Sequence, residues 1–206
     1  MTPVVGFDLD MTLVDSADAI VDSVAHTVRR YGVEIDERAV RASVGLPLDR
    51  VFPGYIPDVA YAEALEVYRA RYLSHGLAMQ SLLPGAREAL ELTTSAGYRI
   101  AVISAKKDTH VRAVLEAVDL DGFVADVVGE RFAETKADAL RDLGALVYVG
   151  DHVGDITGAR GAGALAVGVA TGPTSAAELA AAGADIVLDD LTAYPDFWQQ
   201  WQETQA

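Results

Sequence analysis

Two carboxylates stand one residue apart near the start of the chain, at Asp8 and Asp10, directly after the apolar run 4–7. Such a run is typical of a buried strand in a parallel sheet. A buried carboxylate is costly unless it is paired or bound to a metal ion, so a hydrophobic core alone does not explain the two groups. Side chains at i and i+2 of an extended chain point to the same side. The spacing therefore predicts a polar pocket at the end of this strand, where the Thr12 hydroxyl can fix the turn.

Similar polar residues follow the other expected strands, at the end where open parallel sheets bind their ligands. In chain order the residues at this predicted rim are Asp8, Asp10, Ser104, Lys136, Asp151 and Asp155. Read singly, each could be a helix cap, a turn residue or a solvated side chain. Their joint placement at one rim favours a common site. Only three of the 16 basic residues are lysines, which favours positions that need a compact ammonium group.

These residue types suit phosphoryl transfer. A carboxylate can act as the nucleophile and form an aspartyl-phosphate, and a second carboxyl group can protonate the leaving oxygen and then activate water. Asp8 and Asp151 offer the hard oxygen ligands that suit Mg²⁺, which offsets the repulsion between a carboxylate and a phosphate dianion. Ser104, the backbone N–H groups after it and Lys136 can hold the phosphoryl oxygens.

Strand and helix patterns alternate over the second half of the chain. We expect strands at residues 98–104, 123–129, 146–151, 164–170 and 184–188, with helices at 84–96, 108–118, 135–143, 156–162 and 175–182. This alternation predicts an α/β fold with a doubly wound parallel sheet, to which the first strand also belongs. The aromatic segment 194–201 is expected to be a helix that docks on the core.

Residues 15–81 carry helical patterns and no clear strand pattern. Helices are expected at 15–31, 36–43, 48–52 and 59–74. The chain therefore divides into an α/β core, residues 1–14 and 82–206, and an all-helical cap, residues 15–81, inserted between strand one and strand two.

Four short motifs, in this order, resemble those of the haloacid dehalogenase (HAD) superfamily. The run 8–14 resembles its D-x-D-x-T signature, 102–104 its second motif, Lys136 its third and 150–155 its fourth. The chain is most similar to the phosphoglycolate phosphatase-like and β-phosphoglucomutase-like branch, and the resemblance covers nearly its whole length. It implies a Rossmann-like core with a helical cap. In two places the chain departs from the family pattern: Met11 stands where the family usually has glycine, and the usual prolines around Lys136 are absent.

The resemblance implies a role for each motif residue. Asp8 would be nucleophile and metal ligand, and Asp10 general acid/base with its backbone carbonyl on the metal. Thr12 would support the loop, while Asp151 and Asp155 would bind Mg²⁺. The phosphate would be held by Ser104, the Ala105 N–H and Lys136. Three further residues are candidate substrate contacts, from the cap loop and beside the second motif: Arg50, Lys106 and Lys107.

The expected activity is Mg²⁺-dependent hydrolysis of a small phosphate monoester through an aspartyl-phosphate. A sugar phosphomutase of the same superfamily is an alternative, which detection of isomerised sugar phosphate would reveal. A non-enzymatic, phosphorylatable signalling domain is an alternative of another class, although such domains carry their acceptor on a later strand and have no helical cap. A dehalogenase would lack the second carboxylate of the first motif, and phosphonate cleavage would need a cap lysine.

The composition limits the kinds of partner, metal site and compartment that we expect for this protein. The 206 residues carry a net charge of −15, and 51% of them are apolar, so a folded chain with no nucleic-acid or anionic-membrane partner is expected. Cysteine is absent, which excludes disulfides and thiolate metal sites. With no basic leader pattern and no long apolar run, we expect a cytoplasmic protein. We expect a monomer or homodimer that acts on a small phosphorylated metabolite.

Overall fold

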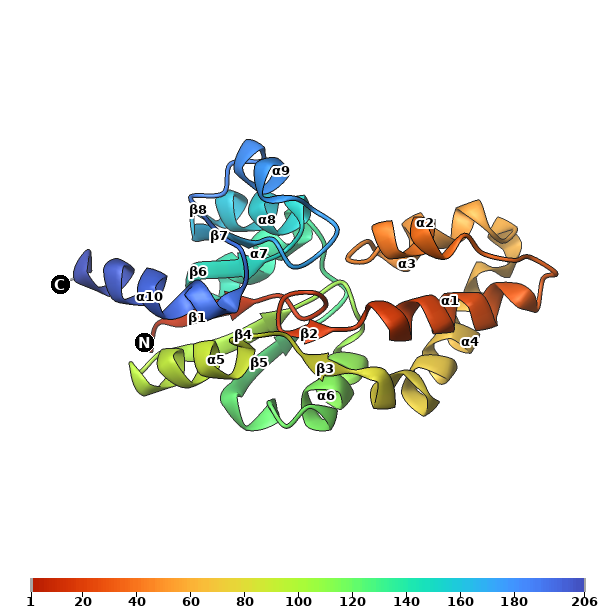
Figure 1. Cartoon of the computed structure of the whole chain (residues 1–206), viewed down its shortest axis with the longest axis horizontal. Coiled ribbons are helices and arrows are strands. Elements are labelled where there is room, and N and C mark those ends of the chain that lie inside the picture. The colour runs from red at the N-terminus through yellow and green to blue at the C-terminus, as the bar shows by residue number, and fades with distance from the viewer. Residues whose placement is uncertain (1, 206) are drawn as a thin grey trace.

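A six-stranded parallel sheet forms the centre of the larger part of the molecule. The computed structural model describes residues 2–205. The sheet contains β1 (Val4–Phe7), β4 (Arg99–Ile103), β5 (Val124–Val128), β6 (Ala145–Gly150), β7 (Leu165–Val169) and β8 (Ile186–Leu188). Its strand order is β5-β4-β1-β6-β7-β8, and every pairing is parallel (Figure 1). The predicted doubly wound sheet is thereby confirmed.

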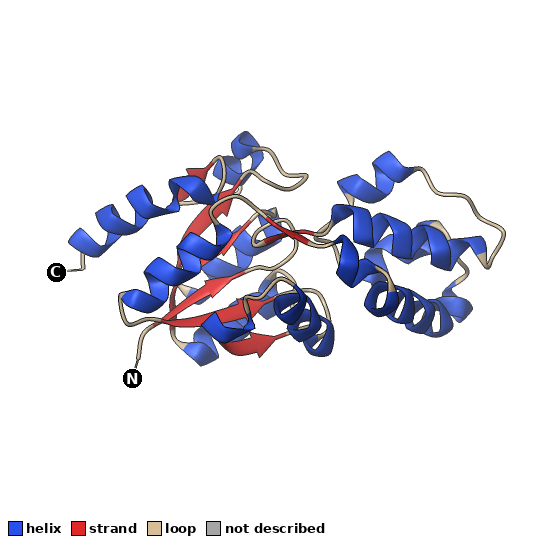
Figure 2. Ribbon diagram, turned by 60° about the horizontal axis from the view of Figure 1, so that its bottom comes forward, coloured by secondary structure: helices blue, strands red, loops and turns tan. Residues whose placement is uncertain are grey.

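Helices cover both faces of the sheet (Figure 2). Because alternate strand residues point to opposite faces, Val5 and Phe7 of β1 join one apolar cluster and Val4 joins another. The first cluster includes residues of α5 (Ala86–Ser95), α6 (Asp108–Ala117) and α10 (Tyr194–Glu203). The second includes residues of α7 (Glu134–Leu143), α8 (Val153–Ala162) and α9 (Ala176–Ala181). The core is therefore two layers of side chains, one on each face of the sheet.

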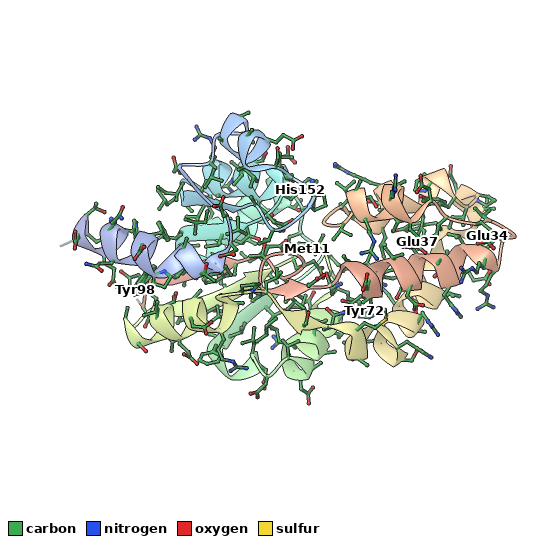
Figure 3. The ribbon with its side chains drawn as sticks, viewed as in Figure 1. Met11, Glu34, Glu37, Tyr72, Tyr98 and His152 are labelled. Carbon is green, nitrogen blue, oxygen red and sulfur yellow. The ribbon has the colours of Figure 1, made fainter. Side chains whose placement is uncertain are left out.

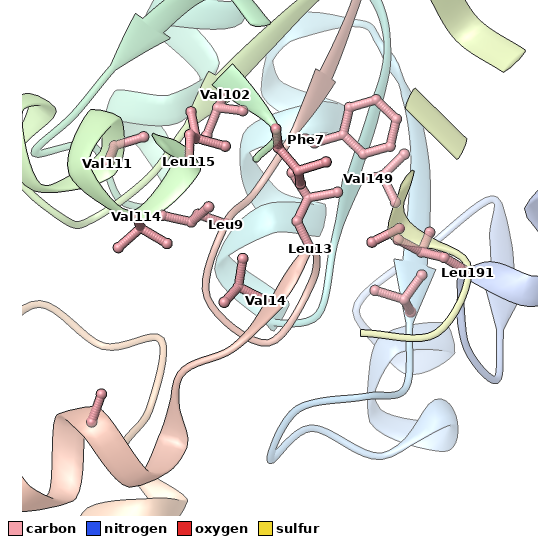
Figure 4. Close-up of a cluster of buried hydrophobic side chains, with 14 of the residues drawn as sticks. Phe7, Leu9, Leu13, Val14, Val102, Val111, Val114, Leu115, Val149 and Leu191 are labelled. Atoms are coloured by element: carbon pink, nitrogen blue, oxygen red, sulfur yellow. The ribbon is translucent and has the colours of Figure 1, made fainter. Parts of the chain in front are cut away.

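The core continues past the end of β1 into the loop that follows it. Figure 4 shows Leu9 and Leu13 of this loop close to Phe7 and to residues of α6. Both leucines are wholly buried. Burial of these two side chains anchors the loop, so the polar residues between them are carried on a fixed backbone.

A helical segment, which we define as residues 17–79, lies to one side of the sheet (Figures 1 and 2). It contains α1 (Ala17–Arg29), α2 (Glu37–Ala42), α3 (Leu48–Val51) and α4 (Tyr61–Ser74), with short 3₁₀ turns at 52–54, 58–60 and 76–79. Arg71 of α4 donates two hydrogen bonds to the Asp22 carboxylate of α1, at 2.7 and 3.0 Å. Two strands connect the segment to the sheet, β2 (Val14–Asp15) and β3 (Ser81–Leu82), which pair antiparallel.

The structure differs from the predicted elements in small ways. The β2–β3 pair is absent from the prediction because two-residue strands carry no readable periodicity. Several elements are shorter by one or two residues at each end. The aromatic helix α10 docks on the core as predicted, with Trp198 buried and its ring 5.1 Å from that of Tyr98. Among residues 2–205, none of the helices combines the length and apolar character needed to span a bilayer.

Candidate active site

The loop after β1 places two carboxylates at the carboxyl edge of the sheet. The Asp8 N–H donates to the Val149 carbonyl at 2.8 Å, so strand pairing with β6 continues through Asp8. The chain then turns tightly, and the N–H groups of Leu13 and Val14 both donate to the Leu9 carbonyl, at 3.0 and 3.1 Å. Met11 (Figure 3) sits in this turn with φ of 57°, the left-handed region that glycine favours. The side chain found where the family usually has glycine is therefore held in a conformation that glycine would adopt more easily.

The structure brings the carboxylates expected at the rim together. One oxygen of each of Asp8, Asp151 and Asp155 lies within 4.8 Å of the others. Asp10 and Ser104 line the same cavity as Asp8. All five residues are buried, each with at most 7% of the whole residue exposed.

Lys136, in the first turn of α7, reaches between two of these carboxylates. Its Nζ lies 3.0 Å from Asp8 Oδ1 and also donates to Asp155 Oδ1. The helices α7 and α8 pack closely at this point, since a Cβ at Gly158 would stand only 2.8 Å from Lys136 Cβ. This packing places Lys136 between the two carboxylates. The lysine predicted from the sequence thus contacts one carboxylate of the first motif, Asp8, and one of the fourth motif, Asp155.

The start of α8 fixes Asp151 and Asp155. The Thr12 hydroxyl donates to Asp151 Oδ1 at 3.0 Å, so Thr12 contacts the carboxylate cluster in addition to its place in the turn. Asp155 Oδ2 accepts from the His152 N–H at 3.0 Å, and His152 Nδ1 accepts from the Gly154 N–H at 3.0 Å. These are the reciprocal bonds of a helix N-cap. They fix the orientation of the Asp155 carboxylate.

Burial and crowding dominate the electrostatics. Burial, with contributions from the Asp155 and Asp10 carboxylates, raises the pKa of Asp8 to about 7 against the opposing effect of Lys136. Burial also raises the pKa of Asp151, with Asp155 and Asp8 contributing. Burial alone would lower the pKa of Lys136, but Asp155 and Asp8 hold it well above its ordinary value. For Asp8 and Asp151, burial and the neighbouring carboxylates therefore outweigh the attraction of the Lys136 ammonium group.

The donor set fits a divalent cation. Among the described residues, Asp151 Oδ2 and Asp10 Oδ1 are buried and accept no hydrogen bond. Unpaired buried carboxylate oxygens are costly unless a cation meets them. All of the clustered ligand atoms are carboxylate oxygens, which is the chemistry that Mg²⁺ and Ca²⁺ prefer.

A cavity of about 440 Å³ separates the rim from the helical segment. Asp8, Asp10, Ser104 and Ala105 line it on the sheet side. On the opposite side Arg50 is among the residues that line it. The candidate substrate residues Lys106 and Lys107 line it as well. Lys106 is nearly buried, with 9% of its side chain exposed, and Lys107 is exposed.

Contacts that the sequence analysis missed join the two walls of the cavity. The Arg50 guanidinium lies over the Phe132 ring, 4.8 Å from its centroid. The Phe132 ring in turn lies 5.4 Å from that of His152, and Arg69 of α4 pairs with Glu130 at 2.7 Å. The one signal for these contacts was the charged and aromatic loop 130–132, between a strand and the helix of Lys136. Nothing in the local sequence pairs that loop with α3 or α4.

Comparison with known proteins agrees with this geometry. The family model for haloacid dehalogenase-like hydrolases matches residues 5–169. A probable phosphatase, IndB, of Dickeya dadantii is 33% identical over 93% of this chain and 91% of its own. A phosphoglycolate phosphatase of Rhodospirillum rubrum is 34% identical over 96% of this chain and 91% of its own. A haloacid dehalogenase-like family hydrolase from Streptococcus pneumoniae has the same fold, with a TM-score of 0.84, 23% identity and coverage of 96% of this chain and 98% of its own.

These matches span both the sheet and the helical segment, and they include the loop of Asp8 and the start of α8. The chain belongs to the haloacid dehalogenase-like hydrolases and is a phosphatase of that family.

Proposed function

We propose that this phosphatase hydrolyses a small phosphate monoester, phosphoglycolate or a close analogue, through an aspartyl-phosphate on Asp8 with Mg²⁺ as cofactor. The observation that carries the proposal is the position of Asp8. Its carboxylate lines the cavity and also belongs to the buried cluster with Asp151 and Asp155. A nucleophile, a cation site and a space for substrate therefore coincide at one residue.

The chain's own residues would divide the reaction as follows. An Asp8 oxygen attacks phosphorus, and the bond from phosphorus to the ester oxygen breaks. Asp10 gives its proton to the departing oxygen. In the second step Asp10 takes a proton from water as that water attacks the phosphorus of the aspartyl-phosphate. The bond from phosphorus to the Asp8 oxygen breaks and inorganic phosphate leaves. Asp8 is then again a carboxylate, and Asp10 again carries its proton.

The phosphoryl oxygens would be held by Ser104, the Ala105 N–H and Lys136. Ser104 and Ala105 line the cavity beside Asp8, and the Lys136 ammonium lies 3.0 Å from Asp8 Oδ1. Fixed donors of this kind stabilise charge that develops in the transition state without reorganising. The Lys136 ammonium would therefore serve both the nucleophile and the transferred group.

The metal would be held by Asp8, Asp151, Asp155 and the Asp10 backbone carbonyl. When bound, the cation neutralises negative charge on the phosphoryl group and the nucleophile. Both Asp155 oxygens already accept hydrogen bonds, from Lys136 and the His152 N–H. This supports contact between Asp155 and the metal through a water molecule.

The size and lining of the cavity support a small substrate with a second anionic group. A volume of about 440 Å³ lies at the low end for small-molecule sites. We assign the second anionic group to Arg50 and Lys107, because the ammonium group of Lys106 is paired with Asp10. We also propose that residues 15–81 act as a cap domain over a core of residues 1–14 and 82–206. The phosphoglycolate phosphatase of Rhodospirillum rubrum, at 34% identity, supports a substrate of this class.

A screen of small phosphate monoesters with and without Mg²⁺ tests the proposal. Phosphoglycolate and ethyl phosphate form a matched pair that differs chiefly in the carboxylate. Arg50→Ala should raise the KM for phosphoglycolate more than that for ethyl phosphate, while Arg38→Ala, an exposed arginine of α2, should change neither. Phosphate release that persists in EDTA or in Asp8→Asn would overturn the assignment.

A further inference from the structure

Lys106, in the loop after β4, carries a second ammonium group at the site, and it faces Asp10. Its Nζ lies 3.2 Å from Asp10 Oδ2, with 9% of the Lys106 side chain and 10% of the Asp10 side chain exposed. Because the other oxygen, Asp10 Oδ1, is buried and accepts no hydrogen bond within the described residues, this ion pair is the contact that orients the carboxyl group.

Tyr72 holds the same ammonium group from the helical segment. The Lys106 Nζ lies 4.0 Å from the centroid of the Tyr72 ring, within the range of a cation–π contact. Tyr72 is wholly buried in the last turn of α4, and Figure 3 labels it near the junction with the sheet. Its ring stacks on that of Tyr68, 6.0 Å away. The position of the ring therefore follows the position of α4.

The backbone of Lys106 belongs to the sheet and is fixed independently. Its N–H donates to the Ser104 hydroxyl at 3.2 Å, and its carbonyl accepts from the Glu130 N–H at 3.0 Å. A Cβ at Gly129 would stand 2.5 Å from that carbonyl oxygen, so the neighbouring strand end packs directly against it. The sheet thus fixes the backbone of Lys106, and Tyr72 of α4 helps to fix the position of its ammonium group.

We propose that Lys106 is a positioning residue that aims the Asp10 carboxyl group, and that Tyr72 couples this aim to the placement of the helical segment. The Asp10 carboxyl group is then set for proton transfer only when α4 stands against the sheet as it does here. This inference rests on the proposed function, which gives Asp10 the proton. It also assigns Lys106 a role other than direct contact with the substrate.

The test compares two small phosphate donors, an ester and an acyl phosphate, that differ in their need for an acid. Ethyl phosphate releases an alkoxide, which needs a proton, whereas acetyl phosphate releases a stable carboxylate, which does not. General acid catalysis typically raises the rate by about 10²–10⁴-fold. A wrongly oriented Asp10 carboxyl group should therefore lower the rate with ethyl phosphate by at least about tenfold. Lys106→Met should slow the single-turnover phosphorylation of Asp8 by ethyl phosphate at least about tenfold more than that by acetyl phosphate.

Matched variants separate positioning from other roles. Tyr72→Leu should shift the ratio of the two rates in the same direction, whereas Tyr72→Phe keeps the ring and should not. Arg112→Met removes an exposed charge of α6 outside the cavity lining and should also leave the ratio unchanged. In Asp10→Asn the further change Lys106→Met should have no effect on the ratio, because the acid is already absent. Lys106→Gln replaces Lys106→Met if the latter does not fold.

Equal slowing of the reactions with ethyl phosphate and acetyl phosphate by Lys106→Met would show a structural role and overturn the inference. A rise in the KM for phosphoglycolate with an unchanged ratio would show substrate binding and overturn it as well. Failure of the proposed function gives a different result: the unsubstituted enzyme would then release no phosphate from either compound, or Asp10→Asn would leave the ratio unchanged.

Discussion

Gly172, in the loop between β7 and α9, leaves room for the Asp151 carboxylate. A Cβ at residue 172 would stand 1.9 Å from Asp151 Oδ2 and 2.8 Å from its Cγ, whereas real Cβ atoms stay at least 3.0 Å from such neighbours. The Gly172 φ lies outside the left-handed region, so alanine meets only this steric conflict. In Gly172→Ala the carboxylate or the loop must therefore move by about 1 Å, a displacement that can cost about 10²-fold in rate when it reaches a reacting group.

The displaced carboxylate should bind Mg²⁺ more weakly. Disturbing the groups that orient a metal ligand typically costs about 10–100-fold in metal affinity, and the 3.0 Å bond from Thr12 to Asp151 would also be strained. We expect the Mg²⁺ concentration for half-maximal activity to rise by about 10–100-fold. The Mg²⁺-dependent rise in melting temperature should require correspondingly more metal.

Titrations of initial rate and of melting temperature with Mg²⁺ measure the effect by two independent readouts. Gly122→Ala is the matched control, because a Cβ there meets nothing within 4 Å. If Gly172→Ala and Gly122→Ala both titrate like the unsubstituted enzyme, Asp151 does not hold the metal in the way we infer.

Three further predictions concern stability. Gly6→Ala should cost about 1–3 kcal/mol in urea unfolding, because its Cβ would lie 2.6 Å from the buried Tyr148 ring; an unchanged midpoint would contradict this. Lys136→Met should cost about 3–5 kcal/mol in EDTA, since buried carboxylates would lose their cation; a change below about 1 kcal/mol would refute the pairing. Burial lowers the pKa of His110, so the unfolded chain binds its proton first and stability falls as pH drops below about 6.5. The charged groups that face His110 are Arg69, Lys106 and Lys107. Urea unfolding at pH 7.5 and 5.5 should show a smaller loss for His110→Gln than for the unsubstituted protein, and equal losses would contradict this.

Much of the sheet and the rim could be predicted from the sequence, because both follow from local patterns. An apolar strand that ends in a polar residue appears at Asp8, Ser104 and Asp151, and the parallel order brings those ends to one edge. The structure places Asp8 and Ser104 on one cavity and clusters Asp8 with Asp151. Their roles in the reaction stay predictions.

The contacts across the cavity could not be predicted. Arg69 and Glu130 are 61 residues apart, and Tyr72 and Lys106 belong to different parts of the fold. Each pair depends on how α4 packs against the sheet, which no periodicity encodes. The pairing of Lys106 with Asp10 was also unforeseen, because a lysine beside the second motif equally suits a substrate contact. The ion pair depends on how the loop after β4 packs beside the loop of Asp10, which no local pattern encodes.

The central claim is that the phosphoryl group passes through Asp8. It is tested most directly by mixing the enzyme with Mg²⁺ and acetyl phosphate, quenching with acid at successive times, and mapping phosphorylated peptides by mass spectrometry. We predict phosphate on Asp8, at higher occupancy in Asp10→Asn because Asp10 also activates the water of the second step, and none in Asp8→Asn. Turnover at the normal rate with no phosphate on Asp8 at any time, or with phosphate on a different residue, would contradict the account.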